Sequence, residues 1–293
     1  MVPLRSALSA IFRQPGILVA EIAWRWSFGA SALGILALGA IRLAHAIAIY
    51  PEEHQMLTSR SPILIAQAIL EISHRAWPPI AHLGIIVIPV LVALWTIAAT
   101  LGRGYVLGRM KSAEPAKSRW LALLALNLLR VVSVVFLVVA YFGCSFATAL
   151  VSHPDSPNYP LAILTFLSLF ITAFAAWSLL HWVISTACIY AARKNAGVLA
   201  SLGATMQLMR SKSRDLFSIA AQNSSVRTVV AFLFTLLALP PFLIHNYTAL
   251  FWTVEVSLFL AYCIASDLLL LARLAAYVDV TEALAEAFAT EHA

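Results

Sequence analysis

The chain has 293 residues, of which 62% are hydrophobic and 11% carry a charged side chain, and its formal net charge is +6. Soluble domains contain about 45–50% apolar and about 25% charged residues, so this composition excludes a soluble globular protein, a disordered chain and a disulfide-rich secreted scaffold. A chain this apolar needs lipid as its solvent, and we expect an all-α, polytopic transmembrane helical bundle with interfacial amphipathic helices.

The N-terminal stretch, residues 1–14, is the first predicted element. Apolar residues such as Leu8 and Ile11 are spaced to share one helical face, which is typical of a short amphipathic helix lying on the membrane surface. Pro15-Gly16 ends it. The apolar run that follows is too long for a cleaved signal peptide and carries charges too early, so we expect it to be a membrane span.

Six apolar runs are each close to the length of about 20 residues that a helix needs to cross a bilayer. Most tryptophans fall toward the ends of these runs, as side chains at a membrane–water interface do. We therefore predict six spans in a single integral membrane domain of residues 1–293. The predicted spans are 17–44, 80–101, 131–151, 161–183, 226–244 and 249–271, and a helical tail at 272–293 follows them.

The connection between the first and second spans, residues 45–79, is the only sizeable one on its side of the membrane. Ser61-Pro62 is a favourable helix start, because serine caps a helix and proline suits its first turn. Polar residues that include Glu71 then share one face, with isoleucines on the opposite face. This pattern predicts an interfacial helix at Ile63–Trp77, and a lid over a cavity is the alternative.

Lysine and arginine are distributed unevenly between the two sides of the predicted bundle. Two lie in the N-terminal stretch, five between the second and third spans, six between the fourth and fifth, and one in the tail, which places 14 of the 19 on one side. Only Arg60 and Arg75 lie on the other side. The positive-inside rule therefore predicts a cell-membrane protein with both termini in the cytoplasm. The net positive charge indicates contact with anionic lipid headgroups, and we expect no nucleic-acid partner.

Two segments on the predicted cytoplasmic side are candidates for protein contact. Residues 195–225 alternate small residues with leucine and methionine and carry the basic cluster Arg210–Arg214. Because small residues permit close helix packing, this segment is either an amphipathic linker helix at the headgroups or a coupling helix that docks onto a partner. The tail at 272–293 is rich in Ala, Leu and Glu and is expected to be a cytoplasmic helix.

Ionisable residues within the spans are the main functional candidates, because each costs about 2.5–3.5 kcal/mol at mid-helix. Glu21 and Arg25 are four residues apart on the first span, Arg130 opens the third, and Asp267 lies late on the sixth. All four therefore fall toward the cytoplasmic leaflet, and we predict an ion-paired polar cluster there. The alternative is that the arginines extend to lipid phosphates and Asp267 pairs locally.

Glu255 differs from these four because it lies in the outer half of the sixth span, with no cation close in sequence. Arg42, at the outer end of the first span, is the nearest plausible partner at a similar depth. The alternative is a protonated Glu255 that is hydrogen-bonded to a neighbouring helix. A protonatable carboxyl at this depth would suit a proton-coupled transporter.

The sequence offers no metal, cofactor or catalytic motif. Six of the eight histidines fall on or near the outer side, but none forms a close ligand pair, and the three cysteines are scattered through apolar spans. Neither a P-loop nor a Gly-rich dinucleotide turn, an HExxH motif or a nucleophile elbow is found. We expect no cofactor, no bound metal and no catalytic residue. An intramembrane enzyme is an alternative only at the predicted polar cluster.

Three segments resemble those of six-span bacterial membrane-domain families. They are Leu8–Gly16 before the first span, Leu101–Leu107 after the second, and the small-residue helix at 197–210 with its basic tail. In this order they are similar to the membrane domain associated with glycerophosphodiester phosphodiesterases and to Yip-type proteins. The resemblance implies a helical membrane domain without catalytic residues, and these 293 residues contain no phosphodiesterase catalytic domain.

These patterns predict a non-enzymatic polytopic integral membrane protein that is a scaffold or an accessory subunit of a membrane complex, with a membrane or cytoplasmic protein as its partner. The alternative is a small transporter or permease subunit for a small solute or lipid, with Glu255 and the Glu21/Arg25/Arg130/Asp267 cluster as its pathway. A water-accessible cavity that reaches Glu255 or the cluster would favour transport, and a dry packed bundle would favour a scaffold.

Overall fold

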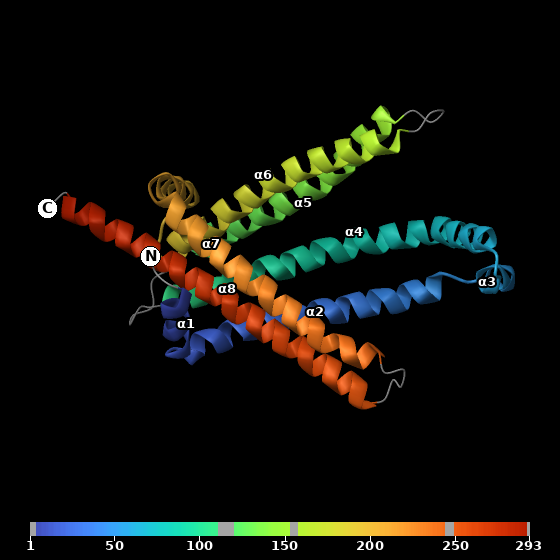
Figure 1. Cartoon of the computed structure of the whole chain (residues 1–293), viewed down its shortest axis with the longest axis horizontal. Coiled ribbons are helices and arrows are strands. Elements are labelled where there is room, and N and C mark those ends of the chain that lie inside the picture. The colour runs from blue at the N-terminus through green and yellow to red at the C-terminus, as the bar shows by residue number, and fades with distance from the viewer. Residues whose placement is uncertain (1–3, 111–119, 153–157, 244–248, 292–293) are drawn as a thin grey trace. The chain divides into compact units, whose positions relative to one another are not determined.

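The computed structural model describes residues 4–110, 120–152, 158–243 and 249–291, and all regular structure in these ranges is α-helical (Figure 1). Six of the helices are long and apolar enough to cross a bilayer, which confirms the predicted all-α polytopic class. The predicted loop cations Lys111, Lys117 and Arg119 lie outside the described residues. The helices are α1 (Leu4–Phe12), α2 (Pro15–Ala46), α3 (Pro51–Thr58), α4 (Pro62–Arg109), α5 (Trp120–Val151), α6 (Tyr159–Arg193), α7 (Val198–Leu243) and α8 (Ala249–Glu291).

The chain divides into two compact units, and the division falls within α2 and α4. The first unit contains Met1–Ala23 and Ala99–Ala293, and the second contains Trp24–Ala98. The first unit therefore holds the start of α2 and the end of α4, together with α1 and α5 to α8. The single membrane domain predicted from the sequence stays a prediction.

The first unit is built from two helical hairpins, in which α5 packs along α6 and α7 packs along α8. The hairpins share one core at the ends where α6 and α8 are buried, over 183–192 and 271–278. Beyond that core the two hairpins diverge (Figure 1), and large apolar side chains there are exposed, such as Phe146 on α5 and Phe259 on α8. Such exposure suits a lipid environment, where apolar side chains carry no penalty.

Small residues explain why the hairpins approach each other closely at the shared core. On α6, Ala187, Ala191 and Ala192 are buried, and on α8 Ala272 and Ala276 are buried. Helices in lipid associate through van der Waals packing, which small side chains favour because they let two backbones come close. Larger side chains from α5, such as Leu123 and Leu126, fill the remaining space in the same core.

Helix α1 packs against α8. Its buried residues, Ala7 and Ile11, are four apart and so share one face, whereas Phe12 is exposed. Part of the apolar stripe is therefore covered by the chain itself, and the predicted position of this helix on the membrane surface stays a prediction.

Helix α7 contains a bend at Lys212, where the backbone angles φ −129° and ψ 28° are not helical. Before the bend, Ser201, Thr205 and Leu208 follow each other at helical spacing, and all three are buried. The Thr205 hydroxyl donates to the Ser201 carbonyl oxygen at 2.8 Å. The small-residue face noted in the sequence is therefore packed within the first unit, while the part after the bend forms the hairpin with α8.

In the second unit, α3 is held to α4 by Glu53 and Arg75. Arg75 donates to the Glu53 carboxylate and, at 2.9 Å, to the Ala48 carbonyl oxygen. Its guanidinium also lies 4.3 Å from the centre of the Tyr50 ring. The Tyr50 backbone N–H donates to the Glu53 carboxylate at 2.9 Å, which caps the start of α3.

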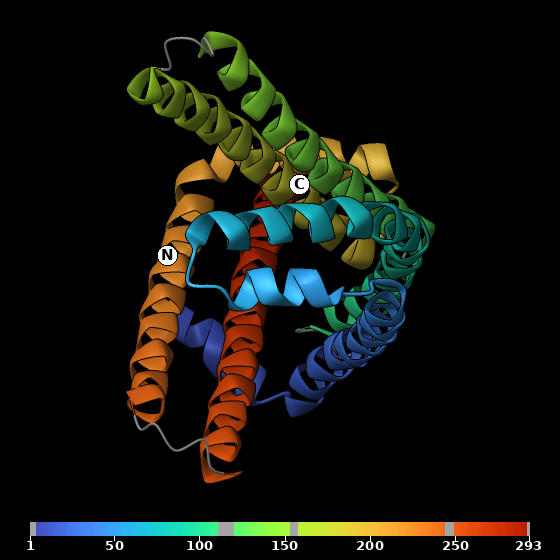
Figure 2. The same ribbon diagram turned by 90° about the vertical axis from the view of Figure 1, so that its right-hand side faces the viewer.

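Helix α4 combines the predicted interfacial helix and the predicted second span into one helix. It continues through Pro78 and Pro79, and Figure 2 shows its first part running crosswise to the rest. Two adjacent prolines remove two helical hydrogen bonds, which permits such a bend without ending the helix. Further along, α4 approaches α2 closely, because a Cβ added at Gly39 would meet the Leu83 side chain at 3.2 Å.

Candidate functional site

The four residues of the predicted polar cluster are placed as follows. Glu21, Arg130 and Asp267 are 0%, 3% and 7% exposed and belong to the first unit. Arg25 is half-buried and belongs to the second unit, where its guanidinium lies 5.2 Å from the centre of the Trp24 ring. Each of the four interacts with a neighbouring group. Ion pairing among them stays a prediction.

Arg130 belongs to a buried polar stripe on α5 that the sequence analysis did not identify. Its Nη2 donates to the Ser185 hydroxyl of α6 at 2.8 Å. One turn earlier, the Asn127 amide donates to the Thr100 hydroxyl of α4 at 3.1 Å, and Asn127 is fully buried. Ser133, three residues after Arg130, is also buried. The three-residue spacing of these polar side chains within an apolar run is the signal that could have revealed the stripe.

Two further arginines act on the same histidine as Arg130. Arg103 of α4 and Arg273 of α8 act electrostatically, together with Arg130, on His181 of α6. Arg273 also lies 5.3 Å from the centre of the Tyr277 ring. Arg103 and Arg273 each follow the end of a predicted span, so the sequence indicates basic flanking positions for both. The core end of the first unit therefore gathers three arginines, from three different helices, around one histidine.

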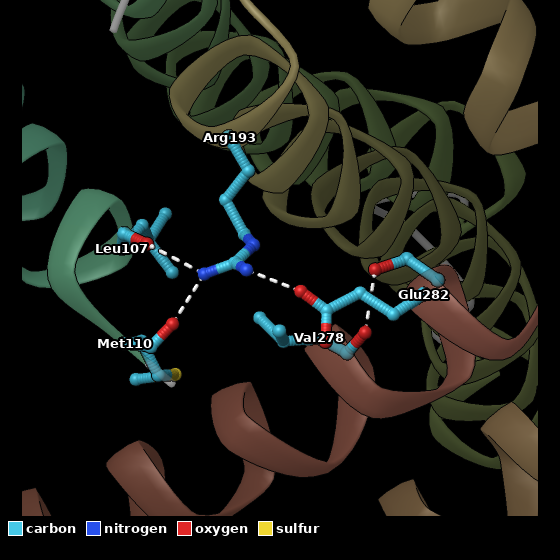
Figure 3. A network of polar contacts seen from close by, with 6 residues as sticks. Leu107, Met110, Arg193, Val278 and Glu282 are labelled. Atoms are coloured by element: carbon cyan, nitrogen blue, oxygen red, sulfur yellow. Dashed lines mark hydrogen bonds and ion pairs between the residues drawn. The ribbon is translucent and has the colours of Figure 1, made fainter. Parts of the chain in front are cut away.

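Arg193, the last residue of α6, joins three helices at the same end of the first unit (Figure 3). Its Nη1 donates to the Leu107 carbonyl oxygen at 3.4 Å and to the Met110 carbonyl oxygen. Its Nη2 forms an ion pair with Glu282 of α8. The carbonyl groups at the end of a helix have no intrahelical partner and carry partial negative charge, so the guanidinium caps the C-terminus of α4.

Glu255 lines a groove between α7 and α8, in the part of the hairpin away from the shared core. The groove has a volume of about 340 Å³. The Oε1 atom of Glu255 is buried, and no described residue hydrogen-bonds to it. Arg42, the partner proposed from the sequence, belongs to the second unit, so that pairing stays a prediction. The groove is lined by Ala231, Phe234, Thr235, Ala238, Glu255, Leu258, Phe259 and Tyr262.

The described residues do not bring metal-ligating side chains together. No group of three or more His, Cys, Asp or Glu residues among them could hold a metal ion. Cys144, Cys188 and Cys263 are free thiols on two hairpins. Of the predicted outer histidines, His153 and His245 lie outside the described residues. The predicted absence of a cofactor is untested by this arrangement.

The fold and these sites define a class, the multi-pass integral membrane proteins built entirely from α-helices. The chain matches no protein-family model, no curated protein and no solved structure in the three comparisons made with it. The resemblance to the membrane domain of glycerophosphodiester phosphodiesterases and to Yip-type proteins therefore stays a prediction.

Proposed function

We propose that this protein is a non-enzymatic scaffold or accessory subunit of a membrane protein complex. Three glycines inside the spans carry the proposal. Apart from the backbone of the surrounding helical turns and the two chain neighbours, no described residue of the same unit lies within 4 Å of the Cβ position at Gly29 and Gly34 of α2 or at Gly143 of α5. A glycine inside a helix costs about 0.5–1 kcal/mol relative to alanine, and membrane helices use it where another helix approaches closely. These faces suit the close approach of a partner helix.

The exposed surface of α6 supports the same proposal. The most apolar 18-residue stretch of this helix contains no buried residue, and its neighbour α5 exposes Phe142 and Phe146. The α5–α6 hairpin therefore offers a long apolar surface beyond the shared core, on which a partner's membrane helix can pack. In this proposal the protein lies in the cell membrane with both termini in the cytoplasm, where its basic residues contact anionic headgroups.

Extraction of the full chain in polymer-bounded native nanodiscs, followed by native mass spectrometry, tests the scaffold proposal. We expect a species heavier than the 31.8 kDa chain, with one defined partner subunit. Gly143→Leu should remove that subunit, because the larger side chain blocks close approach. Val138→Leu, on an exposed position of the same helix, is the matched control and should retain it. A single chain in every preparation would contradict the proposal.

A small transporter or permease subunit is the second candidate, and the groove at Glu255 is the observation that favours it. A carboxyl group inside a membrane span marks a substrate or proton pathway in many transporters. Reconstituted liposomes that contain a pH-sensitive dye would test proton movement. Under this second function, an imposed membrane potential drives proton flux through the wild-type protein, and Glu255→Gln abolishes it.

A further inference from the structure

We propose that the groove between α7 and α8 is a binding site for a lipophilic organic cation, with the Glu255 carboxylate as its counter-ion. The ligand class comprises hydrophobic amines and quaternary ammonium or phosphonium ions. This site goes beyond the scaffold role, because it needs no partner subunit. Three features of the groove carry the proposal, namely its one charged residue, its aromatic lining and its open side.

Glu255 is the only charged side chain among the described residues that line the groove. Its Oε1 atom is buried and receives no hydrogen bond from a described residue. One of the two hydroxyl groups in the lining is already committed, since Thr235 donates to the Ala231 carbonyl oxygen at 2.9 Å. A carboxylate in an apolar setting is costly unless a cation or a hydrogen-bond donor neutralises it, and a bound cation supplies what the groove lacks.

Three of the seven remaining lining residues are aromatic. Phe234 of α7 and Tyr262 of α8 meet edge to face, with ring centres 5.7 Å apart, and Phe259 lines the same groove. Aromatic faces attract cations, and the attraction strengthens where water is excluded. Several rings beside one carboxylate form a surface that favours an organic cation over a metal ion, which would require several oxygen or nitrogen ligands.

The open side of the groove determines how a ligand reaches it. Phe259 is 64% exposed, and Thr235 is exposed as well. Both residues lie within the predicted membrane spans, so a ligand enters from the lipid rather than from water. The volume of about 340 Å³ falls in the range of about 300–1,000 Å³ that holds small molecules. A hydrophobic cation that partitions into the bilayer meets both requirements.

Equilibrium binding to the full chain in nanodiscs of zwitterionic lipid tests the proposal. The probes are radiolabelled tetraphenylphosphonium and tetraphenylborate, which have the same shape and opposite charge. We expect saturable binding of the phosphonium ion alone, and Glu255→Gln should weaken it about tenfold or more because the counter-ion is lost. Glu71→Gln is the matched control, since Glu71 is exposed on α4, and it should leave binding unchanged.

Two further variants keep the result clear if Glu255→Gln lowers stability. Glu255→Asp retains the charge and should retain measurable binding, whereas Ala238→Phe retains Glu255 but fills the groove and should abolish binding. Thermal unfolding of each variant shows that it is folded. Equal binding of both probes, or unchanged binding in the folded Glu255→Gln and Ala238→Phe proteins, would overturn the proposal. The Gly143→Leu protein should bind the probe normally, so failure of the binding-site proposal can be told apart from failure of the scaffold proposal.

Discussion

We expect buried charged side chains to have the largest individual effects on the free energy of unfolding. Arg130 is the clearest case. It is almost fully buried and its guanidinium donates to Ser185 of the neighbouring helix. A guanidinium in such a position stays charged. It therefore needs negative charge nearby, and the buried carboxylates Glu21 and Asp267 of the same unit are the groups that could supply it.

A double-mutant cycle tests the predicted pairing of Arg130 with Asp267. We expect Arg130→Gln and Asp267→Asn each to lower the free energy of unfolding by about 3–5 kcal/mol, because each leaves an uncompensated buried charge. The double variant should lose less than the sum of the two, with a coupling of about 0.5–3 kcal/mol. Titration with sodium dodecyl sulfate in micelles measures the free energy of unfolding of the wild type, the two single variants and the double variant. Strictly additive losses would favour local pairing instead.

Glu53 gives a prediction about pH. The hydrogen bond from the Tyr50 N–H, assisted by Arg75 and opposed by desolvation, holds the pKa of Glu53 below its ordinary value of 4.5. A lowered folded-state pKa means that the carboxylate stabilises α3 above pH 4.5 and that this contribution is lost as pH falls through the lowered value. Amide hydrogen exchange over residues 50–58, corrected for intrinsic rates, should show α3 opening in acid.

Glu53→Gln should remove this pH dependence and leave the same amides poorly protected at neutral pH. Glu52→Gln changes the exposed neighbour and should behave like the wild-type protein. If Glu53→Gln kept the acid-induced opening, another group would have to be responsible for it.

At the scale of the helices, the junction at Arg193 combines two kinds of contact, hydrogen bonds to backbone carbonyl groups and an ion pair with Glu282. Substitutions can separate their contributions to stability. Arg193 is largely buried and caps the C-terminus of α4, whereas the Glu282 side chain that pairs with it is 40% exposed. Arg193→Met should lower the free energy of unfolding by about 1.5–3 kcal/mol, because backbone carbonyl groups lose a charged donor. Glu282→Gln should cost less than about 1 kcal/mol, as exposed ion pairs do. Thermal unfolding in micelles compares them, and equal losses would contradict the capping role.

The helices show what the sequence could and could not predict. All six spans were predictable, because the length of an apolar run fixes where a helix can cross a bilayer. The continuity of α4 through Pro78 and Pro79 was not, since proline usually ends a helix and local propensity does not show what supports one that continues. The bend at Lys212 likewise carries no proline or glycine signal.

Sites that depend on two helices were the least predictable. Glu255 was identifiable as an unusual residue, but the groove beside it needs Phe234 and Ala238 of α7 placed against α8. The same holds for Asn127, whose partner Thr100 is 27 residues away. Hydropathy and spacing within one helix contain no information about such pairings, which depend on how helices pack.

At the scale of the whole molecule, the predicted orientation is open to a direct test. In a variant without native cysteines, a single cysteine replaces either Gln55 on α3 or Lys212 at the bend of α7, and both positions are exposed. A membrane-impermeant maleimide added to intact cells should label Gln55→Cys and not Lys212→Cys, because the charge pattern places α3 outside and α7's bend inside. As a control, both variants should be labelled after lysis. The reverse pattern in intact cells would show that the topology is the inverse of the predicted one.

The length of helix α8 has a consequence for how its two ends are connected. Its 43 residues form one straight helix (Figure 1), which at a rise of 1.5 Å per residue is about 65 Å long. That is about twice the thickness of the hydrocarbon layer, so the helix is longer than one crossing of this layer requires. Glu255 lies toward one end and Glu282 toward the other. The end that carries Glu282 is packed in the shared core and paired with Arg193, so one continuous helix connects the groove at Glu255 to the Arg193 junction.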